Sequence, residues 1–439
     1  MTDDTTQPTG TAQPDTTQET GTAQPGTTQA TGAAQPGTTQ PDIATLRADT
    51  RAFLETHPPE AVRTEADRLA HLEARFDAGL AAVHYPEGLG GRGLPRHLQT
   101  QVDDILTAAG APDNRPTRNV VNLGMAGPTI LAAGTPEQKQ RFMRPLWTGR
   151  HVWCQLFSEP GAGSDLAGLA TRAVRDGDDW VVTGQKVWTT LAHIADWAIL
   201  VARTDPSVPK HRGLTYFLLD MKSPGVTVRP LRQITGEAEF NEVYLDEVRI
   251  PDALRLGAEG DGWRIATYTL SNERSGTGTE PPRESGAPGN LFRAWRDLPP
   301  QERETGLRDA VTAAWIRSEA IRLTQRDVGI RMAAGDPPPE ASALKLAKAE
   351  NSKETASLLL QALGDRSLEH DDGYAFTRPL EMNFDVGGLP ATTAYLRSRA
   401  NSLEGGTSEV LRTVIGERIL GLPREPRTDI DVPFTEVPR

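Results

Sequence analysis

Disulfides, a basic surface and long apolar runs are all missing from this chain. It has 439 residues and a single cysteine, Cys154, so no disulfide can form within it and a reducing compartment is expected. Its 59 acidic side chains outnumber 47 basic ones, for a formal net charge of -12, whereas a general nucleic-acid binder needs a basic face. No apolar stretch is long enough to span a bilayer, and residues 1–5 lack the basic and apolar parts of a secretory signal. The sequence therefore predicts a cytoplasmic protein with no nucleic-acid partner and no membrane span.

The first 42 residues are poor in side chains that could build a core. Gly-Thr-Ala-Gln-Pro at residues 10–14 recurs at 21–25, and the variant Gly-Ala-Ala-Gln-Pro stands at 32–36. Thr, Gln, Gly and Pro bury too little apolar surface to offset the entropy lost on ordering. We expect residues 1–42 to be a disordered repeat tail, and a spacer role is favoured over a docking role.

Beyond that tail the pattern divides the chain into three parts. Apolar residues spaced three and four apart predict an N-terminal helical domain over residues 43–150. Short β-type runs separated by turns predict an antiparallel β domain over 151–255. Helical spacing then returns in a C-terminal helix bundle over 256–424, followed by a polar tail at 425–439. The predicted fold class is therefore α+β and multidomain.

Individual elements can be placed within these parts. The β-type runs are rich in Val, Trp, Leu and Tyr, and the helices carry apolar residues at helical spacing, with a loop rich in Pro and Gly at 279–302. The expected strands cover 180–188, 197–202, 214–219 and 243–245, and the expected C-terminal helices cover 262–276, 303–334, 338–363 and 407–420.

The stretch from Leu156 to Asp165 has the composition of a binding segment. It follows an apolar run and combines a proline and two glycines with Ser158, Ser164 and Asp165. Glycine lets a backbone approach a flat or charged ligand closely, and the polar side chains can bond that ligand. A surface turn has similar composition, so the motifs that follow it decide the interpretation.

Several motifs occur in a fixed order along the chain. They are Ser158–Asp165, Trp188-Thr189-Thr190, Phe240-Asn241-Glu242-Val243, Gly262-Trp263 and Gly406-Thr407-Ser408-Glu409. Together they resemble the acyl-CoA dehydrogenase family over residues 43–424. The resemblance implies that family's three-part fold and FAD as the cofactor. It also implies a reaction that removes a proton from Cα and a hydride from Cβ of an acyl thioester, and no metal.

The resemblance assigns roles to individual residues. Ser158 would bond the flavin ring edge, Trp188 would pack beside the isoalloxazine and Thr190 would bond near N5. Without the resemblance, Trp188 would be read as a β-core aromatic and Thr190 as a solvent-facing strand residue. The implied cofactor-binding residues are Phe157, Ser158, Gly163, Ser164, Trp188, Thr190, Thr407 and Glu409.

Two glutamates are candidates for the catalytic base. Many family members carry the base immediately before Gly-Thr-Ser, but this chain has Gly405 there, and Glu404 is one residue away. On a helix that starts near Trp263, Glu273 shares an apolar face with Ala266 and Leu270. One branch of the family, which includes isovaleryl-CoA dehydrogenase, carries its base on this helix just before an arginine. We therefore expect Glu273 to be the base. The alternatives are that Glu273 only forms a salt bridge, or that Glu404 is the base.

Other residues would serve substrate binding. The backbone N–H of Gly405 is expected to polarise the thioester carbonyl, which acidifies the Cα proton. Thr407 is expected to cap the helix that follows it. Arg274 would steady the carrier part of the thioester or pair with a carboxylate, and Ser164 would lie near that carrier or the flavin pyrophosphate.

Three features depart from the family's usual pattern. Arg326–Ile330 lacks the Phe-Gly of the motif that reaches a neighbouring subunit's FAD, and Gln361–Asp365 has one glycine where two are usual. An insert of about residues 366–396 follows. These departures resemble actinobacterial-type members, some of which form dimers or heteromers, so a homo- or hetero-oligomer is expected.

Alternatives to dehydrogenation remain open at this point. The same fold supports flavin oxidases or monooxygenases in biosynthesis, and the altered flavin loop would suit a non-catalytic subunit of a heteromeric dehydrogenase. The substrate could be an acyl-CoA or an acyl-carrier-protein thioester. The electron acceptor could be an electron-transfer flavoprotein or oxygen.

Overall fold

The computed structural model describes residues 43–275, 281–333, 340–368, 374–383, 388–426 and 429–437. The predicted repeat tail, residues 1–42, lies outside the described residues, as do the side chains of Glu273 and Arg274. Residues 43–439 form one structural unit. Across the described residues, no helix is both long enough and apolar enough to cross a membrane.

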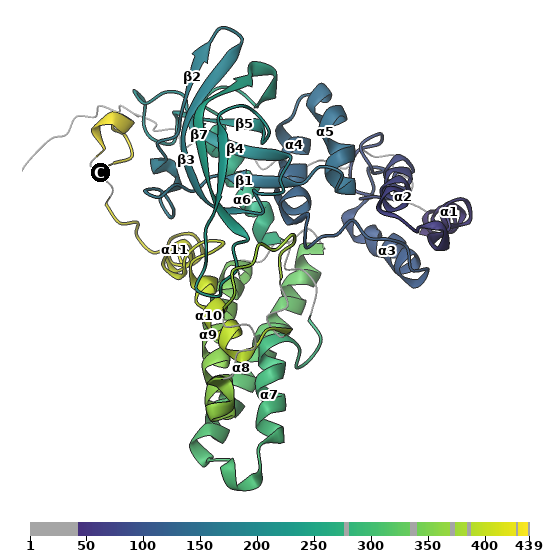
Figure 1. Cartoon of the computed structure of the whole chain (residues 1–439), viewed down its shortest axis with the longest axis vertical. Helices are drawn as coiled ribbons and strands as arrows, with labels where there is room; N and C mark the ends of the chain where they lie inside the picture. Colours follow the sequence, from purple (N-terminus) through teal and green to yellow (C-terminus); the bar gives the residue numbers. More distant parts are fainter. Residues whose placement is uncertain are drawn as a thin grey trace, which may run out of the picture. The chain divides into compact units, whose positions relative to one another are not determined.

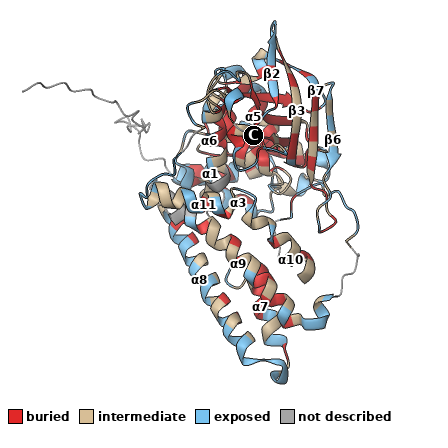
Figure 2. Ribbon diagram, turned by 90° about the vertical axis from the view of Figure 1, so that its left-hand side faces the viewer, coloured by how far each residue is buried: buried red, intermediate tan, exposed pale blue. Residues whose placement is uncertain are grey.

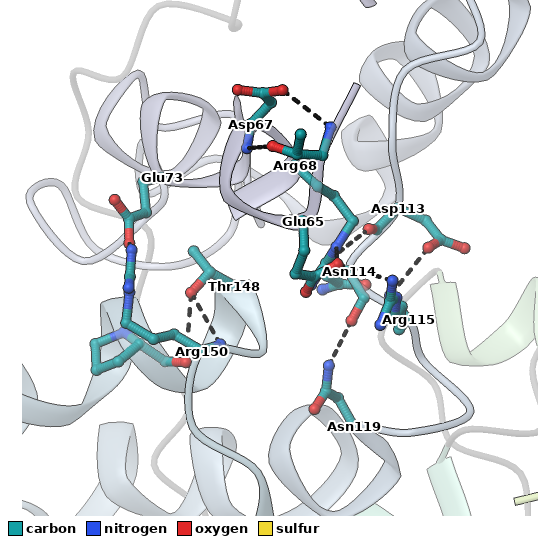
Figure 3. Close-up of polar contacts among 12 residues, drawn as sticks. Glu65, Asp67, Arg68, Glu73, Asp113, Asn114, Arg115, Asn119, Thr148 and Arg150 are labelled. Carbon is teal, nitrogen blue, oxygen red and sulfur yellow. Dashed lines mark hydrogen bonds and ion pairs between the residues drawn. The ribbon is translucent and has the colours of Figure 1, made fainter. Parts of the chain in front are cut away.

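Helices make up the first part of the described chain (Figure 1). Two of them begin with reciprocal caps, in which Thr64 bonds Asp67 and Thr135 bonds Gln138, and these caps satisfy backbone N–H groups that a helix start leaves open. Ion pairs then join this region's helices and loops: Arg115 pairs with Glu65 at 2.8 Å, and Arg150 pairs with Glu73 (Figure 3). The helices are α1 (Ile43–Thr56), α2 (Glu65–Asp77), α3 (Gln99–Ala108), α4 (Gly127–Ala133) and α5 (Pro136–Thr148).

The middle of the chain forms an eight-stranded sheet in the order β6-β7-β3-β2-β4-β5-β8, with β1 beside β4. Most pairs are antiparallel, as the sequence predicted, and β1 and β2 each pair with β4 in parallel. Strand β3 lies between β2 and β4 in sequence and runs in the opposite direction, so β4 runs in the same direction as β2. The strands are β1 (Trp153–Leu156), β2 (Arg172–Asp176), β3 (Asp179–Thr190), β4 (Trp197–Arg203), β5 (Leu214–Asp220), β6 (Val226–Pro230), β7 (Phe240–Pro251) and β8 (Arg255–Leu256).

Strands β4 and β5 lie at the centre of the core. Every residue of β4 is buried, and so is every residue of β5 except the last. Such continuous apolar runs occur where both faces of a strand are covered. Buried residues are correspondingly concentrated in the sheet, whereas α8 is mostly exposed or half-buried (Figure 2).

The last part of the chain is helical. The expected loop at 279–302 contains a helix, α7, and the prediction of a loop there was wrong. Its Gly-Ala-Pro-Gly start looks like a breaker, but proline is tolerated in a first helical turn, and Leu291 and Phe292 are buried one turn later. The helices are α6 (Gly262–Ser275), α7 (Gly286–Asp297), α8 (Thr305–Ala333), α9 (Glu340–Leu363), α10 (Ala391–Ser398) and α11 (Ser408–Val414), with a π-helical turn at Ile415–Ile419.

Candidate active site

The segment after β1 leaves the sheet through a tight loop. Glu159 and Ala162 exchange both backbone hydrogen bonds, at 3.0 Å each. Phe157, just before this loop, is buried with its ring edge-on to Tyr216. Gly163 and Ser164 are exposed, and a Cβ added at Gly163 would meet no atom within 4 Å. The segment thus has a buried start and an exposed stretch at Gly163 and Ser164.

A buried ion pair fixes the start of this segment to strand β3. The Lys186 side chain is fully buried, and its Nζ donates to the Phe157 carbonyl and to Glu159 Oε1, both at 2.9 Å. Glu159 also accepts the backbone N–H groups of Ala170 and Thr171. Burial opposes ionisation of Glu159, but Lys186 and these N–H groups lower the pKa of the carboxyl below its ordinary value. Glu159 is therefore a structural carboxylate.

The end of β3 presents an aromatic side chain to solvent. The register shifts between Lys186 and Thr189, and Trp188 in this bulge has φ +60°, a left-handed conformation that costs about 1–3 kcal/mol for a residue other than glycine. The indole is 57% exposed and touches Phe240 edge-on. Trp188 is therefore not a core aromatic, which was the alternative interpretation from the sequence.

Two threonines follow Trp188 with different surroundings. Thr189 is buried, and its hydroxyl has no hydrogen-bond partner within the part of the chain that the structure describes. Thr190 is half-buried and pairs with Phe240 of β7. Because Val187 N–H donates to the Ser158 carbonyl at 2.9 Å, this end of β3 lies directly beside the Ser158 segment.

Asn241 holds the bulge in place. Its side-chain amide donates to the carbonyls of Thr189 and Glu239, at 3.1 Å each, and its Oδ1 accepts from Arg378 at 2.8 Å. Arg378 belongs to the insert that the sequence singled out. The insert therefore contacts β7 at Asn241, the residue that bonds the Thr189 carbonyl next to Trp188.

Helix α6 packs its buried face on the sheet. Ile265, Ala266 and Thr269 are buried, while Trp263 and Leu270 are half-buried against the same core, so the buried stripe is rotated slightly from the expected face. The Thr269 hydroxyl lies 3.1 Å from the Tyr216 hydroxyl, and Tyr216 contacts Phe157. Helix α6 is thus linked to the Ser158 segment. It continues through Glu273 and Arg274, whose side chains lie outside the described residues.

The loop before α11 is attached to the helical region. Glu404 is 41% exposed and pairs with Arg397 at 3.0 Å. Gly405 and Gly406 have φ +61° and +95°, so both use backbone conformations that favour glycine. A glutamate in the usual family position, residue 405, would be strained here.

Helix α11 starts as the sequence predicted. The Thr407 hydroxyl accepts the Val410 N–H at 3.2 Å, which confirms the expected cap. Glu409 is exposed and pairs with Arg412 at 3.6 Å. The structure therefore brings Phe157, Ser158 and Trp188 together, and attaches Glu404, Thr407 and Glu409 to the helices.

Sequence reasoning missed two parts of this site. Lys186 bonds Glu159 across 27 positions of sequence, and the sign that the sequence offered was a lysine inside the β-type run at 180–188. The hydroxyl cluster of Thr129, Tyr216 and Thr269, with Thr129 and Thr269 2.9 Å apart, joins three elements and left no sequence pattern.

These residues suit the flat ring and polar edge of a flavin. Trp188 offers an exposed aromatic face, Thr189 offers a buried hydroxyl without a described partner, and the space next to Gly163 is open. An aromatic plane, a spare hydrogen-bonding group and backbone without side chains are what a planar polar cofactor needs. Phe157, Ser158, Trp188 and Thr190 would hold it.

Sequence comparison covers all three parts of the chain. Family models match the acyl-CoA dehydrogenase N-terminal domain at residues 40–150, the middle domain at 154–248 and the C-terminal domain at 260–420. Acyl-CoA dehydrogenase FadE34 of Mycobacterium tuberculosis is 42% identical over 359 residues, 80% of this chain. This match spans only 46% of FadE34. Acyl-CoA dehydrogenase IpdE1 of the same organism is 38% identical over 354 residues, 79% of this chain and 86% of IpdE1.

Solved structures give the same result. The Tcur3481-Tcur3483 steroid ACAD matches 87% of this chain and 98% of its own, at TM-score 0.63 and 27% identity. The ChsE4-ChsE5 complex from Mycobacterium tuberculosis matches 89% of this chain and 100% of its own, at TM-score 0.62 and 28% identity. The chain therefore belongs to the acyl-CoA dehydrogenase family, whose members are FAD-dependent oxidoreductases that act on CH–CH bonds.

Proposed function

We propose that this chain catalyses the α,β-dehydrogenation of an acyl thioester. The observation that carries the proposal is the bulge at the end of β3, which exposes Trp188 beside the Ser158 segment. When bound, FAD supplies the acceptor for the hydride that leaves Cβ. The chain's own residues hold the ring, position the thioester and take the Cα proton.

We assign the proton abstraction to Glu273. Helix α6 carries this residue and is linked through Thr269 and Tyr216 to Phe157, so the helix is held against the wall that would bind the flavin. Glu404 is instead exposed and ion-paired with Arg397, which is a poor environment for a base that needs a dry site. Loss of the Cα proton to the Glu273 carboxylate and of hydride from Cβ leaves a Cα=Cβ double bond.

The glycine pair before α11 suits a supporting role. Without a side chain, Gly405 leaves its N–H accessible to a thioester carbonyl. Lys345 Nζ donates to the Gly406 carbonyl at 2.7 Å and fixes this loop to α9. Arg274 is proposed to steady the carrier part of the thioester, and Ser164 to bond either that part or the flavin pyrophosphate.

The relatives suggest which thioesters to try first. One structural relative, at 27% identity, is named a steroid ACAD, and a sequence relative at 30% identity is named a short-chain specific acyl-CoA dehydrogenase. We propose an acyl-CoA as the substrate, with a bulky polycyclic acyl group ranked above a short straight chain. Because two structural relatives pair differently named chains, an oligomeric enzyme is also proposed, with native mass as its measure.

Anaerobic flavin bleaching tests this function. Purified yellow protein is mixed with steroid-linked, branched and short-chain acyl-CoAs, and the visible flavin absorbance is followed. At least one thioester should bleach the flavin, and Glu273→Gln should slow bleaching about 100-fold or more, the usual size of a general-base effect. Glu404→Gln is the matched control and should stay within about threefold, because a surface pair contributes little.

Other outcomes would contradict the assignment. Bleaching that is lost in Glu404→Gln and kept in Glu273→Gln would move the base to Glu404. Flavin that no thioester bleaches, but that oxygen reoxidises rapidly after chemical reduction, would favour an oxidase or monooxygenase. Protein that never retains flavin would favour a non-catalytic subunit.

A further inference from the structure

The C-terminal segment at residues 429–437 lies beyond the part of the chain that matches the family, which ends at residue 420. It is nevertheless packed on the connection between β4 and β5. Phe434 N–H donates to the Val208 carbonyl at 3.0 Å, and Thr435 N–H donates to the Pro206 carbonyl at 3.3 Å. Pro433 forms a bridge with Pro209. This short segment therefore has a defined docking site on the β region.

Phe434 is the anchor of the segment. Its side chain is buried, and its ring lies over the Arg203 guanidinium, with 3.4 Å between the guanidinium carbon and the ring centroid. A cation facing an aromatic ring in a desolvated place is a strong interaction of its type. Phe434 therefore covers the Arg203 guanidinium on the ring-facing side.

Arg203 in turn holds three backbone carbonyls. It lies at the end of β4, is buried, and donates to the carbonyls of Ala167 at 2.6 Å, Leu169 at 3.1 Å and Lys210 at 3.1 Å. Ala167 and Leu169 belong to the short 3-10 turn Leu166–Gly168 and its cap, which directly follow the Ser158–Asp165 segment. The Arg203 side chain therefore connects Phe434 to the turn that follows the Ser158–Asp165 segment.

A second contact joins the same two parts of the chain. The Lys210 side chain is almost fully buried, and its Nζ donates to both carboxylate oxygens of Asp165, at 3.0 and 2.8 Å, and to Asp429 at 2.6 Å. Asp165 ends the Ser158–Asp165 segment, and Asp429 begins the docked C-terminal segment. One ammonium group therefore binds a carboxylate from each.

We propose that residues 429–437 are a brace that positions the Ser158–Asp165 segment for cofactor and thioester binding. Phe434 acts through Arg203 and Asp429 acts through Lys210, so both are positioning residues that touch neither FAD nor substrate. The inference rests on the proposed function, because that function makes the Ser158–Asp165 segment one wall of the site. Without the brace the segment keeps its Lys186–Glu159 anchor at one end, and at the other end Arg203 and Lys210 lose their contacts with Phe434 and Asp429.

Hydrogen exchange in the full-length protein tests the brace directly. Phe434→Ala should raise the exchange rate of the amides of residues 161–169 about tenfold or more, because local opening becomes easier. Amides of β4 away from Arg203 should keep their rates. Glu436→Ala, a change at an exposed residue of the same segment, is the matched control and should stay within about twofold.

FAD binding to the apoprotein supplies a readout that does not depend on turnover. Phe434→Ala should raise the FAD dissociation constant about tenfold, a moderate change in binding, and Phe434→Tyr should restore it because an aromatic ring still covers Arg203. In the FAD-saturated enzyme, KM for the acyl-CoA should rise severalfold while kcat changes less than about twofold. Asp429→Asn should shift the same quantities in the same direction by less.

The outcomes separate the two proposals. If the exchange rates of residues 161–169 and the FAD dissociation constant are both unchanged in Phe434→Ala, the brace is overturned. This holds even if the variant has a lower melting temperature. If Phe434→Ala does not fold, Phe434→Leu is measured against the same limits. A wild-type enzyme that oxidises no thioester would sink the proposed function alone, because exchange and FAD affinity would still report on the brace.

Discussion

The β region buries some of its charged side chains, whereas ion pairs of the C-terminal helices stay partly exposed. In the β region Lys186 is fully buried with Glu159, and Arg203 is buried with three carbonyls. In the helices ion pairs such as Lys353 with Glu350 on α9 are partly exposed, at 26% and 44%. Burial makes a charge costly unless its partners are fixed, and both Lys186 and Arg203 bond backbone carbonyls that are fixed in the β region.

Apolar side chains show the same difference. All of β4 is buried, whereas α8 exposes Ile316, Leu323 and Ile330 at intervals of seven residues. Residues seven apart lie on one face of a helix. The β region closes its own core and can serve as a fixed wall, and the helices leave an apolar face open.

The largest expected effect comes from breaking the buried pair. Lys186→Met should lower the free energy of unfolding by about 3–5 kcal/mol, because it leaves the Glu159 carboxylate buried without its cation. Lys353→Met in the helices should cost under about 1 kcal/mol. Urea unfolding measures both. Equal losses of unfolding free energy in Lys186→Met and Lys353→Met would show that burial does not make the β-region pair more important for stability.

A core truncation gives the next largest effect. Leu200→Ala on β4, at 0% exposure, should lower the free energy of unfolding by about 3 kcal/mol through lost burial and a cavity. Leu323→Ala on α8, at 50% exposure, should cost about 0.5 kcal/mol in the isolated chain. A cost at Leu323 that appears only at high protein concentration would show that α8 is covered in an assembly.

A pH dependence of the β region should be smaller. The Arg255 guanidinium and the Trp180 indole outweigh partial burial and lower the pKa of Asp252 from 3.8 to about 2. The unfolded carboxylate therefore takes up its proton first, and the stability that Asp252 contributes is present above pH 3.8 and lost as the pH falls towards about 2.

Asp252→Asn measures this contribution. After discounting for solvent exposure, the free energy of unfolding of the wild type should exceed that of Asp252→Asn by about 1 kcal/mol at pH 6. This difference should vanish near pH 2. Asp309→Asn on α8, where the carboxylate is 66% exposed, should change stability little at either pH. Melting temperatures at several pH values give both curves, and a difference for Asp252→Asn that persists at pH 2 would rule out this account.

Much of the fold was predictable because its signals are local. Short runs rich in Val, Trp, Leu and Tyr located β3, β4 and β5, helical spacing located α6, α8 and α9, and Thr407 marked a helix start that the structure confirms. Helix α7 was missed because a Gly- and Pro-rich start hid a helix whose stability comes from burying Leu291 and Phe292.

The details of the site depended on contacts that are distant in sequence. Trp188 is exposed because β3 and β7 shift register at a bulge, and register is a property of two strands. The Lys186–Glu159 pair and the Asn241–Arg378 contact join residues 27 and 137 positions apart. Family resemblance could mark the right segments, but local sequence could not show which groups hold them.

The single cysteine has a practical consequence for experiments. Cys154 lies on β1 with no exposed surface, and burial raises the pKa of its thiol, so the nucleophilic thiolate is suppressed. A maleimide dye or spin label added to the folded enzyme should leave Cys154 unmodified. One cysteine introduced at an exposed position such as Glu436 would then carry the only probe, without any prior mutation of the native chain.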